Sequence, residues 1–244
     1  MLSDQTFDPS KFKKIKKAEK EHFWFVARRK WIFDRIRQFC VPPADFLEVG
    51  CGTGNVSSFL AKAGYVVTGC ELYEEAIKIA WQGFKIMKGD ANSLPFENQS
   101  FDIVGLFDVI EHLDDPVIAL KEALRVLKPG GIVSVTVPAR KELWSYYDEI
   151  SLHRRRYTKE SLSCILQEAG FSVLKINYMF MALYLPMKYL RGNQKHGSAD
   201  QFNINPLVNV LLKRLFEMER HISGFLPLPI GTSLIGVARK DIRD

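Results

Sequence analysis

The amino-acid sequence predicts an α/β fold, in which a doubly wound and mostly parallel sheet is covered by helices on both faces. From Phe46 onward, short apolar segments typical of strands alternate with segments of helical periodicity. This alternation leaves a helix between successive strands, which is the arrangement that parallel strands require. A glycine-rich stretch, "GCGTG" at 50–54, follows the first strand, where folds of this class bind ligands.

Residues typical of helix ends define the individual elements. Asp115 and Pro116 are an N-cap and a first-turn proline, and Thr158 and Asn205 are further N-cap residues. "LKPGG" at 127–131 predicts a tight turn. The expected helices span 54–63, 73–82, 116–127, 158–170 and 206–222, and the expected strands span 46–50, 65–71, 84–90, 101–108, 132–137, 171–178 and 232–239.

The positive charge of the chain lies in an N-terminal arm, residues 1–40, which we expect to be helical. The chain has a net charge of +6, and the arm holds 11 Lys and Arg against 5 Asp and Glu. The main domain, residues 41–244, is therefore neutral overall. This distribution argues against a nucleic-acid-binding face on the main domain. A long apolar insertion at 180–230 predicts a lid-like element before the last strand.

Cysteine spacing and hydropathy favour a cytoplasmic protein. None of the four cysteines has metal-ligand spacing, so we expect reduced thiols. The first ten residues are polar and do not resemble a secretory signal. The most apolar stretch, 176–190, is interrupted by Pro186 and Lys188 and is too short to span a bilayer.

The glycine loop predicts a ligand that approaches bare backbone. A glycine-rich turn between a strand and a helix presents N–H groups and a positive helix end. The dinucleotide fingerprint requires a further glycine where this chain has Asn55, which disfavours a nicotinamide-dependent oxidoreductase. A phosphate-binding P-loop would need Gly-Lys-Ser/Thr, which is absent.

Acidic residues end two further strands of the predicted sheet. Glu71 follows Gly50 by 21 residues, where a carboxylate can bind both hydroxyls of a ribose. Asp90 ends the next strand, where its carboxylate can accept from an adenine amine and the Ala91 N–H can donate to a ring nitrogen. Because the carboxyl ends of parallel strands share one edge, these groups predict a nucleoside site at that edge.

These motifs resemble those of the class I S-adenosylmethionine-dependent methyltransferases. The matching stretches are "LEVGCGTGN", Glu71, "GDANSLPF", "FDIVGLFDVIEHLDDP" and "LKPGG", in the family's order over residues 46–138. The resemblance implies a Rossmann-like sheet of seven strands with the last strand antiparallel. It also implies S-adenosyl-L-methionine as cofactor and S-adenosyl-L-homocysteine as product.

The resemblance assigns the cofactor to the glycine loop and the strand ends. The amino-acid end of the cofactor would lie against Gly50–Gly54, with the ribose at Glu71 and the methionine amino group and sulfonium near Phe107 and Asp108. The expected cofactor-binding residues are Glu48, Gly50, Cys51, Gly52, Gly54, Asn55, Glu71, Leu72, Asp90, Ala91, Asn92, Phe107 and Asp108.

A hydroxyl acceptor needs a group that removes its proton, and histidine is the usual choice. His112 at the fourth strand end and His153 in "SLHRRRYT" are the candidates. Three arginines precede the helix that Thr158 caps, where they oppose the helix dipole and predict a nearby anion, either a carboxylate of the chain or the substrate. The candidate substrate contacts are His22, Trp24, Arg28, Trp144, Tyr147, Arg155 and Tyr157.

"DVIEH" at 108–112 also resembles quinone-biosynthesis methyltransferases, some of which bind a metal. Their pattern begins with glutamate, and because this chain has the shorter Asp108 we expect no metal.

The sequence therefore predicts an enzyme that methylates a small-molecule acceptor, of an apolar or lipid-linked kind, with no nucleic-acid partner. A non-catalytic cofactor-binding scaffold or sensor is the alternative. The arm's lysines, with Phe12 and Ile15 on one side, suggest peripheral membrane contact. The alternative is that Phe12 and Ile15 pack on the domain. The oligomeric state is left open.

Overall fold

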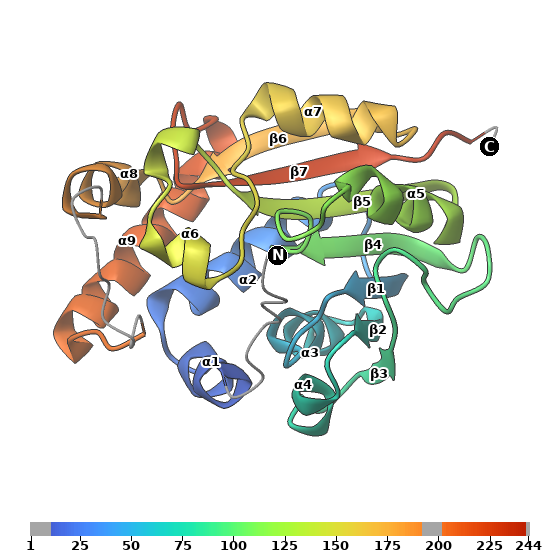
Figure 1. Cartoon of the computed structure of the whole chain (residues 1–244), viewed down its shortest axis with the longest axis horizontal. Helices are drawn as coiled ribbons and strands as arrows, with labels where there is room; N and C mark the ends of the chain where they lie inside the picture. The colour runs from blue at the N-terminus through green and yellow to red at the C-terminus, as the bar shows by residue number, and fades with distance from the viewer. Residues whose placement is uncertain (1–10, 192–201, 243–244) are drawn as a thin grey trace, which may run out of the picture.

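A seven-stranded sheet forms the centre of the computed structural model, which describes residues 11–191 and 202–242. The strand order is β3-β2-β1-β4-β5-β7-β6, and β7 runs antiparallel to both of its neighbours (Figure 1). The predicted mostly parallel sheet with an antiparallel last strand is confirmed. The strands are β1 Asp45–Val49, β2 Val66–Glu71, β3 Lys85–Lys88, β4 Phe101–Phe107, β5 Leu127–Pro138, β6 Ser172–Met179 and β7 Ser233–Arg239.

Helices cover both faces of the sheet. Helix α2 contacts both α3 and α9 in one layer, and α5 and α7 contact each other in the other layer (Figure 1). The α-helices are α1 Lys11–Glu19, α2 Phe23–Ile36, α3 Asn55–Lys62, α4 Glu74–Lys78, α5 Pro116–Val126, α6 Tyr146–Ile150, α7 Lys159–Glu168, α8 Tyr184–Pro186 and α9 Pro206–Phe225. Short helical turns are η1 Lys141–Leu143, η2 Met181–Leu183 and η3 Met187–Arg191.

The predicted N-caps begin the expected helices. The Asp115 carboxylate accepts from the Val117 N–H at 2.9 Å, and Asn205 Oδ1 accepts from the Leu207 N–H at 2.9 Å. Thr158 Oγ1 accepts from the Ser161 N–H at 3.1 Å. Each side chain satisfies a donor that the first helical turn leaves free.

Two local predictions are wrong. The expected turn at 127–131 lies within β5, where a register shift opposite Phe101 and Ile103 accommodates it as an irregularity in the strand. The expected helix 73–82 ends at Lys78, because Trp81 is hydrogen-bonded to the glycine loop and to α1 and does not continue the helix. Its backbone N–H donates to the Thr53 carbonyl at 2.8 Å, and its indole N–H donates to Glu19 at 2.7 Å.

Helix α2 shares the core of the sheet. Its Trp31, Ile32 and Ile36 side chains are at most 1% exposed and belong to the same apolar cluster as the strands. This burial fixes α2 on the sheet, and its first turn, which includes Phe23 and Trp24, lines the candidate site. Among the described residues, no helix is long and apolar enough to cross a membrane.

Candidate cofactor and acceptor site

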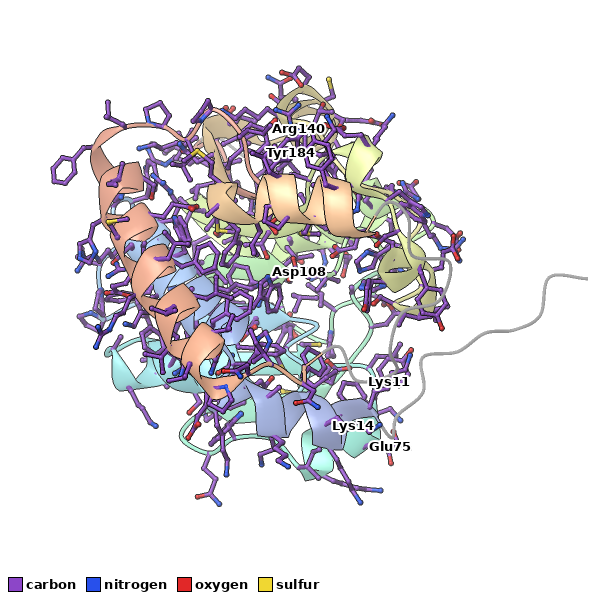
Figure 2. The ribbon with its side chains drawn as sticks, turned by 90° about the vertical axis from the view of Figure 1, so that its left-hand side faces the viewer. Lys11, Lys14, Glu75, Asp108, Arg140 and Tyr184 are labelled. Carbon is purple, nitrogen blue, oxygen red and sulfur yellow. The ribbon has the colours of Figure 1, made fainter. Side chains whose placement is uncertain are left out.

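The candidate site lies at the carboxyl edge of the parallel strands. Strands β1, β2 and β4 end at Val49, Glu71 and Phe107, and their parallel pairing places the following loops together. Figure 2 shows Asp108, which follows β4, near the centre of this side of the molecule. The sequence-predicted groups thus come from separate segments to one edge.

Three glycines of this loop have backbone conformations that favour glycine. Gly50, Gly52 and Gly54 have φ values of +66°, +55° and +79°. A Cβ atom at Gly50 or Gly54 would lie 2.6 Å from Val109 or 2.2 Å from the Phe84 ring, whereas one at Gly52 would meet nothing within 4 Å. The loop therefore packs on two sides and is open above Gly52, where a ligand can approach the backbone.

Two buried carboxylates support this loop from neighbouring strands. Glu71 Oε2 accepts from the Gly52 N–H at 2.7 Å and Oε1 accepts from the Tyr73 N–H at 3.0 Å. Burial raises the pKa of Glu71, although these N–H groups oppose the rise. Glu48 accepts from the Ser57 hydroxyl, and burial raises the pKa of Glu48 to about 7.

The remaining predicted cofactor residues differ in exposure. Asn55 is buried and accepts from Arg29 Nη1 at 2.8 Å, and Cys51 is buried beneath the loop. Leu72 is exposed, as are Asp90 and Asn92. The Asp90 carboxylate accepts from the Asn92 N–H at 2.8 Å. One end of the expected cofactor site is therefore enclosed and the other lies on the surface.

Asp108 and Arg28 form an ion pair between the loop after β4 and helix α2. Arg28 Nη2 lies 2.7 Å from Asp108 Oδ2, and the same atom donates to Thr136 Oγ1 at 3.1 Å. Arg28 is buried and stacks over Trp24 with its guanidinium carbon 5.0 Å from the ring centroid. The ion pair thus holds Asp108 in place. Arg28, a predicted substrate contact, is not among the residues that line the adjoining cavity.

A cavity of about 370 Å³ adjoins Asp108. The sequence-predicted residues that line it are His22, Trp24, Asp108, His112, Tyr147 and His153. Leu183, Met187 and Phe202 of the 180–230 insertion and Ile15 of α1 add apolar surface. A mostly apolar pocket with a few converging polar groups is typical of small-molecule sites.

His153 is oriented toward this cavity by a buried carboxylate. His153 Nδ1 lies 2.9 Å from Asp148 Oδ1, and Arg156 binds both carboxylate oxygens of Asp148 at 2.8 and 3.0 Å. Burial alone would raise the pKa of Asp148, but the hydrogen bonds from His153 and Arg156 outweigh it and lower that pKa to about 2. An ionised carboxylate can only accept a hydrogen bond, so Nδ1 of His153 is the donor in this contact.

His112 lies beside His153, with the ring centroids 4.9 Å apart. Burial, together with the neighbouring His153, lowers the pKa of His112 to about 4. His112 is therefore neutral at physiological pH.

Glu111 is a site residue that the sequence reasoning did not select. It lines the cavity, is 0% exposed, and neither of its carboxylate oxygens has a hydrogen-bond partner among the described residues. Burial, with the nearby Asp108, raises the pKa of Glu111 well above its ordinary value. The only signal in the sequence was its place beside His112. A ligand atom of Glu111 and one each of His112 and His153 lie within 4.8 Å of one another, so these three residues could hold a metal ion.

Besides Arg28, three predicted substrate contacts lie outside the residues that line the cavity. Tyr157 is buried and donates to the Ile110 carbonyl at 3.2 Å, which ties its loop to the strand end. Arg155 donates to the Leu113 and Asp114 carbonyls, and Trp144 is 39% exposed on the surface. For these residues the described contacts are structural.

The three arginines at 154–156 predicted a nearby anion, and two of them pair with carboxylates of the chain. Arg154 lies 2.7 Å from Asp114, and Arg156 binds Asp148.

The apolar side of α1 faces the protein. Phe12 is buried against Tyr73, with ring centroids 5.8 Å apart, and Ile15 lines the cavity. Glu19 accepts from the Thr53 hydroxyl at 2.6 Å, which joins the arm to the glycine loop. Phe12 and Ile15 of the arm thus contact the protein itself, as one of the two alternatives predicted.

Comparisons with known proteins agree with this geometry. Residues 47–135 match the family model described as "Methyltransferase domain". A Mycolicibacterium smegmatis protein named "Probable S-adenosylmethionine-dependent methyltransferase" is 33% identical over 159 residues, which cover 63% of this chain and 61% of that protein. A demethylmenaquinone methyltransferase of Staphylococcus aureus (strain JH9) is 36% identical over 116 residues, covering 41% of this chain and 48% of that enzyme.

The chain thus spans less than two thirds of the length of these two relatives. The fold agrees over a longer range. The structure of a SAM-dependent methyltransferase from Archaeoglobus fulgidus has a TM-score of 0.60 at 22% identity, covering 93% of this chain and 99% of that one. With this fold, the match to the methyltransferase domain over residues 47–135 and the glycine loop at the sheet edge, the chain is similar to S-adenosylmethionine-dependent methyltransferases.

Proposed function

We propose that this chain is an enzyme that transfers a methyl group from S-adenosylmethionine to a hydroxyl of an apolar small molecule. The observation that carries the proposal is the cavity beside Asp108, which combines apolar walls with the Asp148-oriented His153. The name of the Staphylococcus aureus relative, demethylmenaquinone methyltransferase, supports a small-molecule acceptor. A lipid-linked acceptor fits the same apolar walls.

The residues at the sheet edge fit the cofactor. The open side of Gly52 admits a ligand to bare backbone, and the Glu71 carboxylate reaches the same loop. Glu71 would accept from the ribose hydroxyls, and the ion-paired Asp108 would face the amino group and the positive sulfur. S-adenosylmethionine, when bound, supplies a methyl group on a sulfonium that leaves readily.

His153 would act as the general base. Its Nδ1–H donates to Asp148, so the lone pair of Nε2 is available to take the proton of an acceptor hydroxyl. The imidazolium that forms is stabilised by the Asp148 carboxylate, which Arg156 holds in place. This assignment resembles other carboxylate–histidine pairs, in which the carboxylate orients the ring and remains ionised.

Glu111 and the apolar walls would position the acceptor. Burial and the nearby Asp108 raise the pKa of Glu111, which favours its protonated form, and a protonated carboxyl would donate a hydrogen bond to an acceptor oxygen. Trp24, Leu183 and Met187 line the cavity and would exclude water from it once an acceptor is bound. Exclusion of water strengthens the polar contacts inside and protects the in-line geometry that methyl transfer requires.

Label transfer tests this proposal. The purified chain is incubated with methyl-labelled S-adenosylmethionine and fractionated metabolite and lipid extracts, and labelled products are sought in each fraction. We expect label in an organic-extractable compound with wild type and none with Gly52→Val. Binding of S-adenosylhomocysteine without transfer to any fraction would favour the scaffold or sensor alternative.

A further inference from the structure

A second cavity, of about 450 Å³, lies between helices α2 and α9. It shares none of its lining residues with the cavity beside Asp108, which is called the acceptor cavity from here on. Three contacts join its walls, one of which is the Lys30–Glu217 ion pair. Trp31 Nε1 donates to Ser223 Oγ at 3.1 Å, and Arg220 pairs with Asp34. The cavity is therefore bounded by two helices that are fixed to each other, separate from the proposed methyl-transfer chemistry.

Arg35 lines this cavity and has no acidic partner among residues 11–191 and 202–242. Its side chain is 3% exposed, and burial lowers its pKa. Its one hydrogen bond within the described part of the chain joins Nη1 to Gln38 Oε1 at 2.9 Å, and Nε has no partner there. Buried arginines are ordinarily paired with anions, because an uncompensated buried charge is costly. The guanidinium thus retains donors for an anion that enters the cavity.

The cations of this cavity outnumber their carboxylate partners. Lys30, Arg35, Arg37 and Arg220 line it. The acids that pair with them are Asp34, with Arg37 and Arg220, and Glu217, with Lys30 and Arg220. Four cations against two carboxylates leave two positive charges. A phosphate monoester, which carries close to two negative charges at neutral pH, matches this excess better than a single carboxylate does.

Apolar side chains continue from the cavity onto the surface of α9. Phe33 and Phe59 line the inner part, and Phe225 lines the edge while remaining 90% exposed. Ile222 and Leu226 beside it are also exposed. An exposed apolar surface of this kind commonly marks a binding site. The arrangement suits a ligand with an anionic head and an apolar substituent.

We propose that this cavity, named here the Arg35 cavity, binds a phosphate monoester whose apolar substituent lies along Phe225. The guanidinium of Arg35 would donate two hydrogen bonds to the phosphate oxygens, the geometry that arginine favours. Arg37 and Arg220 add positive charge at the same site. A soluble organic phosphate and the head of a monoester phospholipid share this chemistry.

Calorimetry with hexyl phosphate as probe tests the proposal on the full chain. We expect hexyl phosphate to bind more tightly than either inorganic phosphate or hexanol. We expect Arg35→Met to weaken hexyl phosphate binding by about tenfold or more, because a charge-assisted hydrogen-bonded pair is lost. Arg35→Lys should retain part of the affinity. Arg214→Met removes an exposed arginine of α9 outside the cavity and should leave the affinity within about twofold.

Vesicles distinguish the source of the phosphate. Co-sedimentation with phosphatidic acid vesicles, lost in Arg35→Met, would identify a lipid headgroup, while binding of hexyl phosphate alone would identify a soluble ligand. Thermal unfolding and S-adenosylhomocysteine affinity check that each variant folds. A folded Arg35→Met protein that binds hexyl phosphate as wild type does, or a wild type that does not bind it, overturns the proposal without affecting the proposed methyl transfer.

Discussion

The Nδ1 atom of His153 lies 2.9 Å from the Oδ1 atom of Asp148, and this contact orients the imidazole at the wall of the acceptor cavity. Asp148 is 1% exposed and is held by Arg156 through both of its oxygens. The hydrogen bond therefore joins the partly exposed imidazole of His153 to the buried Asp148–Arg156 ion pair. This ion pair holds the ring in one orientation, with Nδ1 as the donor to Asp148.

We expect His153→Gln to lower kcat for methyl transfer by about 10²-fold to 10⁴-fold, the usual contribution of a general base. Cofactor affinity should be unchanged because His153 lies outside the glycine loop. Steady-state kinetics with the identified acceptor, together with calorimetry of S-adenosylhomocysteine, measure both effects. An unchanged kcat in a folded variant would show that the acceptor does not need His153 as base.

Glu71, at the end of β2, is the predicted contact of the cofactor ribose. We expect Glu71→Ala to weaken S-adenosylhomocysteine binding by about 1–3 kcal/mol, because charged hydrogen bonds to the ribose would be lost. Glu75→Ala is the matched control, since Glu75 is exposed on the neighbouring helix α4 (Figure 2). Equal affinities of the two variants would remove Glu71 from the cofactor site.

Gly52 and Gly83 allow the ligand contact to be separated from backbone strain. Both have positive φ, +55° and +99°, and a Cβ atom at either meets nothing within 4 Å. We expect Gly52→Val and Gly83→Val each to lose about 1 kcal/mol or more of stability, from the strained backbone. Only Gly52→Val should abolish cofactor binding. Binding by Gly52→Val within about twofold of wild type would mean that the loop does not touch the cofactor.

Periodicity and local motifs predicted the mostly parallel α/β sheet, and the resemblance to class I methyltransferases added its antiparallel last strand. The alternation of strands and helices, the capping residues and the glycine spacing are local signals. Glu71 was selected from its place at a strand end, whereas Asp108 was selected from the resemblance. Local signals could not show that Trp81 bonds to Thr53 and Glu19, and this tertiary contact shortens α4.

The acceptor cavity was less predictable because its partners are distant in sequence or ambiguous in role. Arg28 meets Asp108 only after α2 has packed across the sheet, so its role as an ion-pair partner has no sequence signal. Tyr157 and Arg155 belong to the right segment, but their contacts depend on the path of that loop. Glu111 could not be selected from the sequence, because what marks it is its burial without a hydrogen-bond partner among the described residues.

The Glu111, His112 and His153 cluster makes the expected independence from metal testable. We expect methyl transfer to persist after dialysis against EDTA, because the Asp148–His153 pair already provides a proton acceptor. Activity before and after dialysis, and after adding Mg²⁺, Mn²⁺ or Zn²⁺, gives the comparison. Loss that one ion restores in wild type, and fails to restore in Glu111→Gln, would assign the cluster to a metal.

His112 should make the stability of the fold sensitive to acid. Its pKa is about 4 in the folded protein, against about 6.5 in an unfolded chain. Between these values the unfolded chain binds a proton that the folded protein excludes, so the free energy of unfolding falls as the pH is lowered from 6.5 to 4. The full effect is at most about 3 kcal/mol.

Glu48 acts in the opposite direction, because its raised pKa of about 7 means that the folded protein takes up its proton first as the pH falls. The difference between wild type and His112→Gln isolates the histidine. Urea unfolding at pH 7 and at pH 4.5 should show wild type losing stability relative to His112→Gln at the lower pH. Parallel changes in the two proteins would show that His112 is not held neutral by its buried position beside His153.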